Sequence, residues 1–130
     1  MEAKHLQAVP LFAGLSKHER GRIAGWADEI DVAAGSHLVD EGRFAHEFFV
    51  VLDGAVDVLR GDVPIAHLGA GDFFGEIALV GHDRRTASVV AATQVRAIVM
   101  HHRDFDEMRQ ELPLVATRVH EAISERMARG

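Results

Sequence analysis

Residues 48–59 read Phe48-Phe49-Val50-Val51-Leu52-Asp53-Gly54-Ala55-Val56-Asp57-Val58-Leu59. Two apolar runs rich in β-branched and aromatic residues flank an Asp-Gly pair, which is the strongest short-range signal of a β-hairpin. From Glu29 to about Met100 similar short runs recur, separated by Gly and Asp residues. Many short strands at this spacing predict a closed antiparallel architecture, a jelly roll or β-roll of the double-stranded β-helix type.

A helical pattern precedes the β region. Ser16 and Glu19 have the spacing of a capping box, in which each side chain bonds the backbone N–H of the other residue. We expect the helix that begins here to continue through Ile23 as far as Trp26-Ala27. The chain therefore enters the β region from a short N-terminal helix.

A second helical region follows the β region. Asp104 is expected to cap a short helix, and Pro113 suits the first turn of the next helix, where its missing N–H has no bond to lose. The last helix carries a stripe at spacings of four and three, which Arg126 continues. The apolar members of this stripe are Val115, Val119, Ala122 and Ile123.

The predicted fold is mostly β with flanking helices, in a single domain over residues 1–130. Its expected parts are an N-terminal helical segment over 1–28, a β-roll over 29–102 and C-terminal helices over 103–130. The 130 residues are 48% hydrophobic and include no cysteine, so one apolar core is expected, without disulfides or cysteine-based metal sites.

Composition also restricts the location and the partners. No stretch approaches the roughly 18 consecutive apolar residues of a membrane span, and no signal peptide is evident, which predicts a cytoplasmic protein with no direct membrane span. The formal net charge is −6. A nucleic-acid partner is not expected, because phosphate contacts need a basic surface. An acidic chain can still hold one small anion if a local device provides the positive charge.

Such a device is indicated by Phe74-Gly75-Glu76-Ile77-Ala78-Leu79, followed after five residues by Arg85-Thr86-Ala87-Ser88-Val89. Gly75 has no Cβ and allows close backbone approach, and the turn after it is expected to begin a short helix whose free N–H groups face an anion. Arg85 adds a planar charged fork that matches two phosphate oxygens. Glu76 needs a donor there, such as a sugar hydroxyl. The alternative is an ordinary ion pair between Glu76 and Arg85 across a loop.

This pattern closely resembles the phosphate-binding cassette of the cyclic-nucleotide-binding domain family, over residues 74–89. The resemblance extends from about Leu6 to Arg126, and bacterial cyclic-nucleotide-gated potassium channels look nearest, with catabolite-activator-type regulators further away. It implies a β-roll that binds cAMP or cGMP, without catalytic residues, cofactor or metal. The further matching segments are Pro10-Leu11-Phe12, Phe48-Phe49-Val50-Val51, Gly54-Ala55-Val56, Leu68-Gly69 and Gly71.

The resemblance also implies roles for individual residues. Arg85 would pair with the exocyclic phosphate oxygens, and Glu76 would accept the ribose 2′-OH. Val58 and Leu68 would line an apolar wall beside the base. Arg126 matches the position from which some channel domains cap the purine, although a solvated arginine is an equal alternative. The complete expected ligand-binding set is Val58, Leu68, Gly75, Glu76, Ile77, Ala78, Arg85, Thr86, Ala87 and Arg126.

Three other functions are compatible with a similar roll. A metalloenzyme of the cupin type needs converging histidines, but the nine histidines are scattered, and His101 and His102 would point to opposite faces of a strand. A catabolite-activator-type regulator needs a helix-turn-helix domain, and the chain stops at Gly130, so it would at most be the truncated sensor half. A ligand-free protein-interaction module would be expected to lack Arg85 or Glu76, and both are present.

We therefore expect a non-catalytic sensor of cAMP or cGMP. On binding, the stripe of Val115, Val119 and Ala122 is expected to fold towards the base and to change the position of the C-terminal helices. The resemblance also makes Thr86 a weak indication of cGMP, because channel relatives with threonine here often accept cGMP, the hydroxyl reaching a syn guanine. A threonine that only starts a strand is an equal alternative, and the base preference stays open. The sequence also leaves open the effector domain or partner protein and the oligomeric state.

Overall fold

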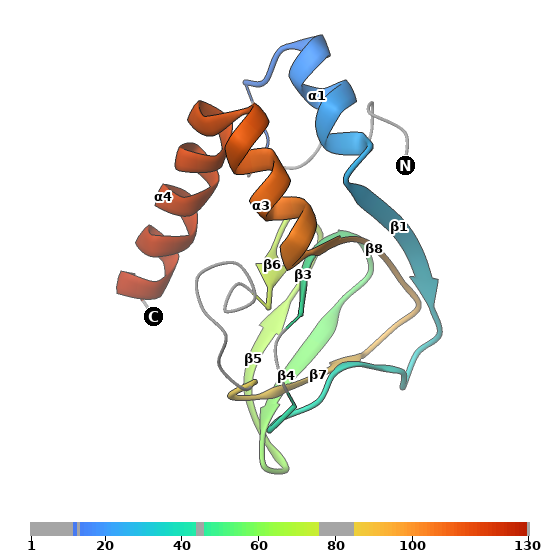
Figure 1. Cartoon of the computed structure of the whole chain (residues 1–130). Helices are drawn as coiled ribbons and strands as arrows, with labels where there is room; N and C mark the ends of the chain where they lie inside the picture. Colours follow the sequence, from blue (N-terminus) through green and yellow to red (C-terminus); the bar gives the residue numbers. More distant parts are fainter. Residues whose placement is uncertain (1–11, 13, 44–45, 76–84, 130) are drawn as a thin grey trace.

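The computed structural model describes residues 12, 14–43, 46–75 and 85–129, and near the C-terminus the side chains of 122–123 and 126–129 lie outside the described part. The chain forms an antiparallel β-roll with helices at both ends, which confirms the predicted fold class (Figure 1). The elements in chain order are α1 (Lys17–Ala24), β1 (Ala27–Val32), β2 (His37–Val39), β3 (Glu47–Asp53), β4 (Val56–Arg60), β5 (Val63–Leu68), β6 (Phe73–Phe74), β7 (Ser88–Ala91), β8 (Val95–His101), α3 (His102–Glu111) and α4 (Pro113–Arg129).

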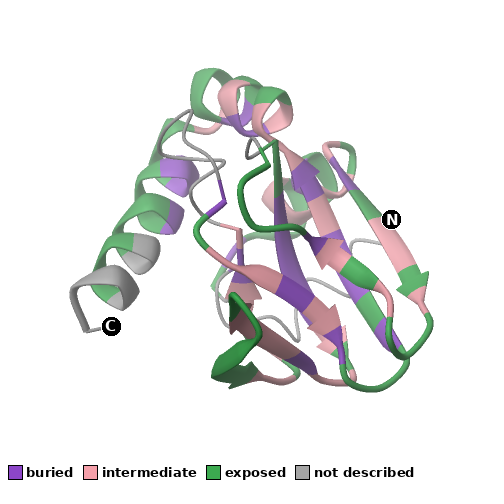
Figure 2. Cartoon of the chain, turned by 90° about the horizontal axis from the view of Figure 1, so that it is seen from below, coloured by how far each residue is buried: buried purple, intermediate pink, exposed green. Residues whose placement is uncertain are grey.

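Two antiparallel four-stranded sheets form the roll. The first has the order β1-β8-β3-β6 and the second the order β2-β7-β4-β5. The helices lie along one side of the roll, where α3 continues directly from β8 (Figure 1). Figure 2 shows buried positions along the strands of the roll and along one side of α4. The described part of the chain thus consists of a helical layer, the first sheet and the second sheet.

Strand β3 explains why these layers form. Phe48 and Val50 pack in a cluster with residues of the helices, whereas Phe49 and Val51 pack in a second cluster with residues of the second sheet. All four are at most 3% exposed. Because side chains alternate across a strand, an uninterrupted apolar run buries both of its faces. This strand therefore lies between the two apolar cores.

The prediction of a hairpin at Asp53-Gly54 is wrong. β3 pairs with β8 and β6, while β4 pairs with β5 and β7, so the Asp-Gly pair leads from one sheet to the other. Both edges of β3 are already occupied by strands that complete the first sheet, and none is left for β4. The tight hairpin lies one connection later, where Arg60 pairs with Val63 across Gly61-Asp62.

The helix ends agree with prediction in two places and differ in two others. The capping box of Ser16 and Glu19 is present, and α4 begins at Pro113. However, α1 ends at Ala24 instead of continuing to Trp26-Ala27, because the chain turns at Gly25 and Ala27 already pairs with Met100 of β8. Asp104 is not the cap of α3 but lies in its first turn. The N-cap is His101.

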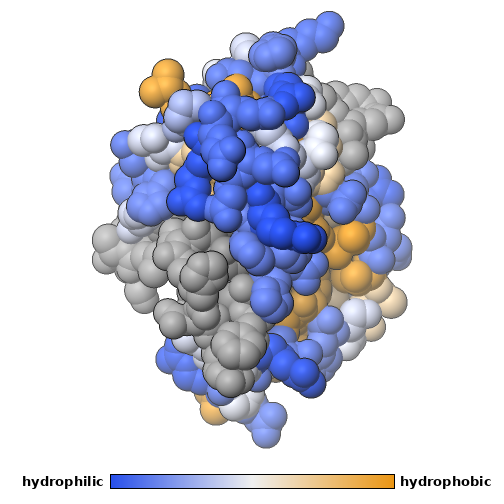
Figure 3. Space-filling model, in the orientation of Figure 1, coloured by the Kyte–Doolittle hydropathy of each residue, from blue (hydrophilic) through white to orange (hydrophobic). Residues whose placement is uncertain are grey.

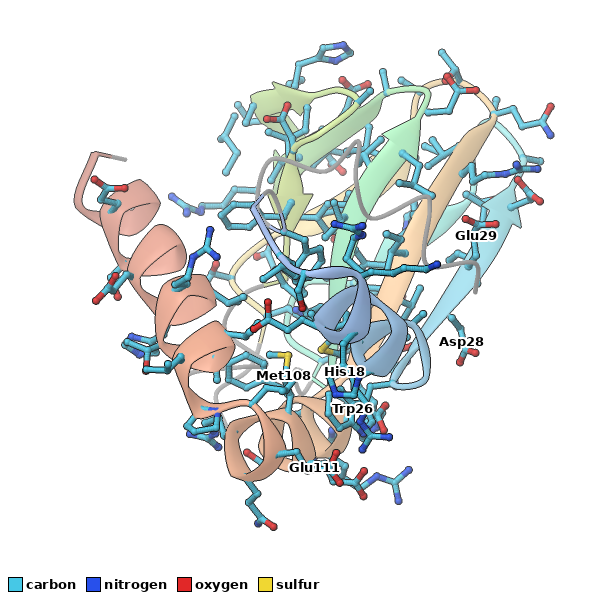
Figure 4. All side chains as sticks on the ribbon, turned by 90° about the horizontal axis from the view of Figure 1, so that it is seen from above. His18, Trp26, Asp28, Glu29, Met108 and Glu111 are labelled. Atoms are coloured by element: carbon cyan, nitrogen blue, oxygen red, sulfur yellow. The ribbon has the colours of Figure 1, made fainter. Side chains whose placement is uncertain are left out.

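Contacts between α1 and α3 hold the helical layer together. Arg22 forms an ion pair with Glu111, and the guanidinium lies over the ring of Trp26. The Trp26 indole Nε1 donates to Glu107 at 3.0 Å. Figure 4 shows Trp26 and Glu111 close to the buried Met108, whereas Asp28 and Glu29 lie farther away along β1. These contacts fix α3 over the first sheet.

The surface of the helical side is mainly hydrophilic, and apolar surface gathers in one area beside it (Figure 3). Among the described side chains, the large apolar residues that are exposed are Val63 and Ile65 on β5 and Leu114 on α4. None of the helices in the described ranges is long and apolar enough to cross a membrane.

The sheet-to-sheet turn at Gly54 gives a test of this packing. Gly54 has φ +94°, and a Cβ there would lie 2.3 Å from the carbonyl oxygen of Gln94. Gly35 has φ +88°, but a Cβ there would have no atom within 4 Å. Backbone strain alone costs about 1–3 kcal/mol. We expect Gly35→Ala to lose this much stability and Gly54→Ala to lose clearly more, as measured by urea unfolding. Equal losses would contradict the close packing at Gly54.

Candidate ligand-binding site

A pocket of about 180 Å³ lies in the roll, where residues of β2, β4, β5 and β7 meet the end of β6 and the segment before β7. Most of its lining is apolar; Arg85 is the charged residue and Thr86 the hydroxyl-bearing residue among the lining residues. The lining residues are Val39, Val58, Ala66, Leu68, Phe74, Gly75, Arg85, Thr86, Ala87 and Val89.

Arg85 is held in this pocket by both its backbone and its side chain. Its N–H donates to the carbonyl of Arg43 at 2.6 Å, and its own carbonyl accepts from the N–H of Gly42 at 2.9 Å. The guanidinium Nη2 donates to the carbonyl of Glu47, the first residue of β3. Arg85 is only 8% exposed. Burial of a charge is costly unless it is compensated, so a buried arginine that borders a pocket marks a place suited to an anion.

Gly75 packs directly against this guanidinium. Its φ is +79°, a conformation that residues with a Cβ rarely adopt. A Cβ at this position would lie 2.7 Å from Nη1 of Arg85 and 2.8 Å from the carbonyl oxygen of Glu47. Any other residue would therefore displace the guanidinium or the start of β3. Glycine is required here both by backbone conformation and by space.

The apolar wall of the pocket comes from the hairpin of β4 and β5. Val58 pairs with Ala66, and Val56 pairs with Leu68, so Val58, Ala66 and Leu68 share the face that lines the pocket. The two larger side chains are half-buried. A flat apolar group that enters beside Arg85 would contact this wall. The arrangement suits a ligand that combines an anionic end with a planar apolar end.

Among the residues described, no group of His, Asp or Glu side chains has an arrangement that suits a metal ion. Among the described residues that line the pocket, Arg85 carries the one ionisable side chain.

Comparison with known proteins identifies the family. The family model "Cyclic nucleotide-binding domain" matches residues 29–111, which is more than half of the chain. The chain belongs to the cyclic nucleotide-binding domain family. The match runs from Glu29 in β1 to Glu111 at the end of α3, and every residue that lines the pocket falls within this range.

Individual relatives include a cAMP-dependent protein kinase regulatory subunit of Aspergillus fumigatus, 40% identical over 93 residues that cover 70% of this chain and 22% of the relative. A cyclic nucleotide-gated potassium channel of Rhizobium etli is 34% identical over 119 residues, 92% of this chain and 33% of the channel. The catabolite activator protein of Thermus thermophilus superposes with a TM-score of 0.82 at 26% identity, over 92% of this chain and 59% of that structure. The chain thus spans a third or less of these two curated relatives.

The structure brings six of the predicted residues together around one pocket: Val58, Leu68, Gly75, Arg85, Thr86 and Ala87. Their contact with a ligand stays a prediction. Glu76, Ile77 and Ala78 lie outside the described residues. Arg126 falls within α4, but its side chain also lies outside the described part.

Val115 and Val119, the members of the α4 stripe whose side chains are described, do not line the pocket. They are buried in the helical core with Phe12, Leu15 and Phe105. The side chains of Ala122 and Ile123 lie outside the described part. Val115 and Val119 thus hold α4 to α3 and to the N-terminal segment. The predicted movement towards the base would have to break these apolar contacts.

Sequence reasoning missed four lining residues, Val39, Ala66, Phe74 and Val89. Two of them were within reach of the strand pattern. Ala66 lies two residues before Leu68 on β5, and Val89 lies two residues after Ala87, so each shares a face with a residue that was predicted. Val39 comes from β2, and its place beside the pocket follows from the pairing of β2 with β7, which the sequence does not encode locally.

Proposed function

We propose that this chain is a non-catalytic sensor that binds the cyclic phosphate and ribose of cAMP or cGMP in the pocket at Arg85. The single observation that carries the proposal is the buried guanidinium of Arg85, which borders a mainly apolar pocket and packs against Gly75. The family membership supports it. The names of the Aspergillus subunit and the Rhizobium channel point to the same class of ligand.

The charge distribution favours a small anion over a large one. The chain carries a net charge of −6, so its overall field repels polyanions such as nucleic acids. A singly charged cyclic phosphate needs only one compensating cation. The planar fork of Arg85 can donate N–H groups to two phosphate oxygens, and the missing Cβ at Gly75 lets the guanidinium pack directly against the backbone.

The remaining contacts are assigned by the family pattern together with the pocket. We place the base against Val58, Ala66 and Leu68, with Thr86 beside it. We assign the ribose 2′-OH to Glu76, with Ile77 and Ala78 in the same cassette turn and Arg126 as the cap of the base. Among these, the contacts of Val58, Leu68 and Thr86 with the pocket are supported by the structure.

A short path of bonds links the pocket to the helices. Arg85 donates to the carbonyl of Glu47, and the carbonyl of the preceding residue, His46, accepts from the N–H of His102 at 2.9 Å. His102 is the first residue of α3. A phosphate that draws the guanidinium acts on the same segment that holds the start of α3. We propose that the ligand shifts α3 and α4 through this segment, to the extent that it binds one arrangement better than the other.

Replacement of the arginine tests the assignment. Arg85→Ala should weaken binding of both cAMP and cGMP by at least about 30-fold in side-by-side calorimetric titrations, because truncation of one partner of a buried charged pair costs about 2–5 kcal/mol. Arg96→Ala is the matched control: Arg96 pairs with Asp31 on the surface and does not line the pocket, so its affinities should match those of the unaltered chain. Unchanged affinity in Arg85→Ala would remove the central assignment. If the unaltered chain bound neither nucleotide, the ligand-free interaction module would be the better description.

The sugar assignment has its own test. Glu76→Ala should reduce the preference for cAMP over 2′-deoxy-cAMP, because the carboxylate that accepts the 2′-OH is lost while the phosphate contacts remain. The ratio of the two dissociation constants is the measurement, and Glu41→Ala, which replaces a carboxylate that does not line the pocket, serves as the control. A ratio that is the same in Glu76→Ala as in the unaltered chain would exclude the role of Glu76.

A further inference from the structure

Three histidines meet where the roll joins α3, although the sequence suggested that they were scattered. β8 ends at His101 and α3 begins at His102, so the alternation expected for two strand residues does not apply and the prediction of opposite faces is wrong. The ring centroids of His101 and His102 are 4.6 Å apart. His46, which precedes β3, lies 6.1 Å from His101 with nearly parallel rings and 5.9 Å from His102. We call these three residues the histidine cluster.

His101 also serves as the N-cap of α3. Its Nδ1 accepts from the backbone N–H of Arg103 at 3.3 Å. A neutral imidazole has one nitrogen that can accept a hydrogen bond, whereas a protonated imidazole has none. Protonation of His101 therefore removes the cap. It also places a positive charge at the N-terminus of α3, where the helix dipole disfavours cations.

The surroundings of His101 oppose protonation on balance. Burial lowers the pKa of His101, and the neighbouring His102 and Arg103 on α3 lower it further. Asp104 on α3 and Glu47 on β3 act in the opposite direction but do not outweigh these effects. The ring of His46 lies on the remaining side.

We propose that the histidine cluster is a proton-sensitive latch, which holds the start of α3 on the roll while His101 is neutral and releases it when His101 is protonated. The pKa of His101 is lower in the attached state than the ordinary value of about 6.5 that applies once α3 is released. The released state therefore binds more protons, so attachment is strongest above about pH 6.5 and weakens as the pH falls through that value. The same segment, His46-Glu47, holds Arg85, which makes this junction a place where pH and ligand can act on one element.

Amide hydrogen exchange of the nucleotide-free chain at pH 7.5 and pH 5.5 tests the latch, after correction for the intrinsic pH dependence of exchange. The amides of residues 105–108, in the first bonded turn of α3, should be less protected at pH 5.5 than at pH 7.5, because the released state binds the additional proton. His101→Asn should remove this loss, because asparagine is a good N-cap that does not titrate. His120→Asn, on the exposed side of α4, should behave like the unaltered chain.

The proposal is overturned if the unaltered chain shows no loss of protection, or if His101→Asn shows the same loss. If His101→Asn fails to fold, an NMR titration of the His101 ring in the unaltered chain replaces this comparison. An apparent pKa of His101 below about 6.5 supports the latch, and a pKa at or above that value overturns it. No nucleotide is present in these experiments. Their outcome is therefore independent of whether the pocket binds cAMP or cGMP.

Discussion

Burial of both faces of β3 is the constraint on which the rest of this structure depends. One face contributes to the core beneath the helices and the other to the core between the two sheets. The strand is thereby fixed in position, and so is Glu47 at its start. The Glu47 carbonyl accepts from Arg85, and the neighbouring His46 carbonyl accepts from the first residue of α3. The pocket and the helical layer are therefore both attached at the start of β3.

The site shows how an acidic protein can provide for an anion. The net charge of −6 gives no general attraction for phosphate, so selectivity must come from one local cation in a protected place. Arg85 supplies that charge at 8% exposure, and the missing Cβ of Gly75 lets the guanidinium pack against the backbone there. In a surrounding of low polarity, a charged hydrogen bond is stronger than at the surface. The apolar wall of Val58 and Leu68 contributes both this surrounding and a contact surface for a ring.

Local signals predicted much of the fold and six of the ten described residues that line the pocket. The capping box at Ser16 and the start of α4 at Pro113 were predictable because each depends on residues close in sequence. Gly75 and Arg85 were predictable because their residue types are demanded by chemistry. The turn at Gly54 was not, because whether an Asp-Gly pair makes a hairpin or leads to another sheet depends on which strands already occupy the edges of β3. Likewise, Val39 lies beside the pocket because β2 pairs with β7, and no local sequence signal predicts that pairing.

The histidine cluster is a second feature that local sequence signals did not predict. The distance in sequence between His46 and the adjacent pair His101-His102 concealed that a strand end, a helix start and a loop bring these three together.

Whether the pocket holds a cyclic nucleotide is tested most directly by a crystal structure of the chain with cAMP or cGMP bound. The account predicts phosphate oxygens within hydrogen-bond distance of the Arg85 guanidinium, about 2.7–2.9 Å, and the base against Val58 and Leu68. A nucleotide bound elsewhere, or a pocket that stays without one at saturating concentration, would contradict it.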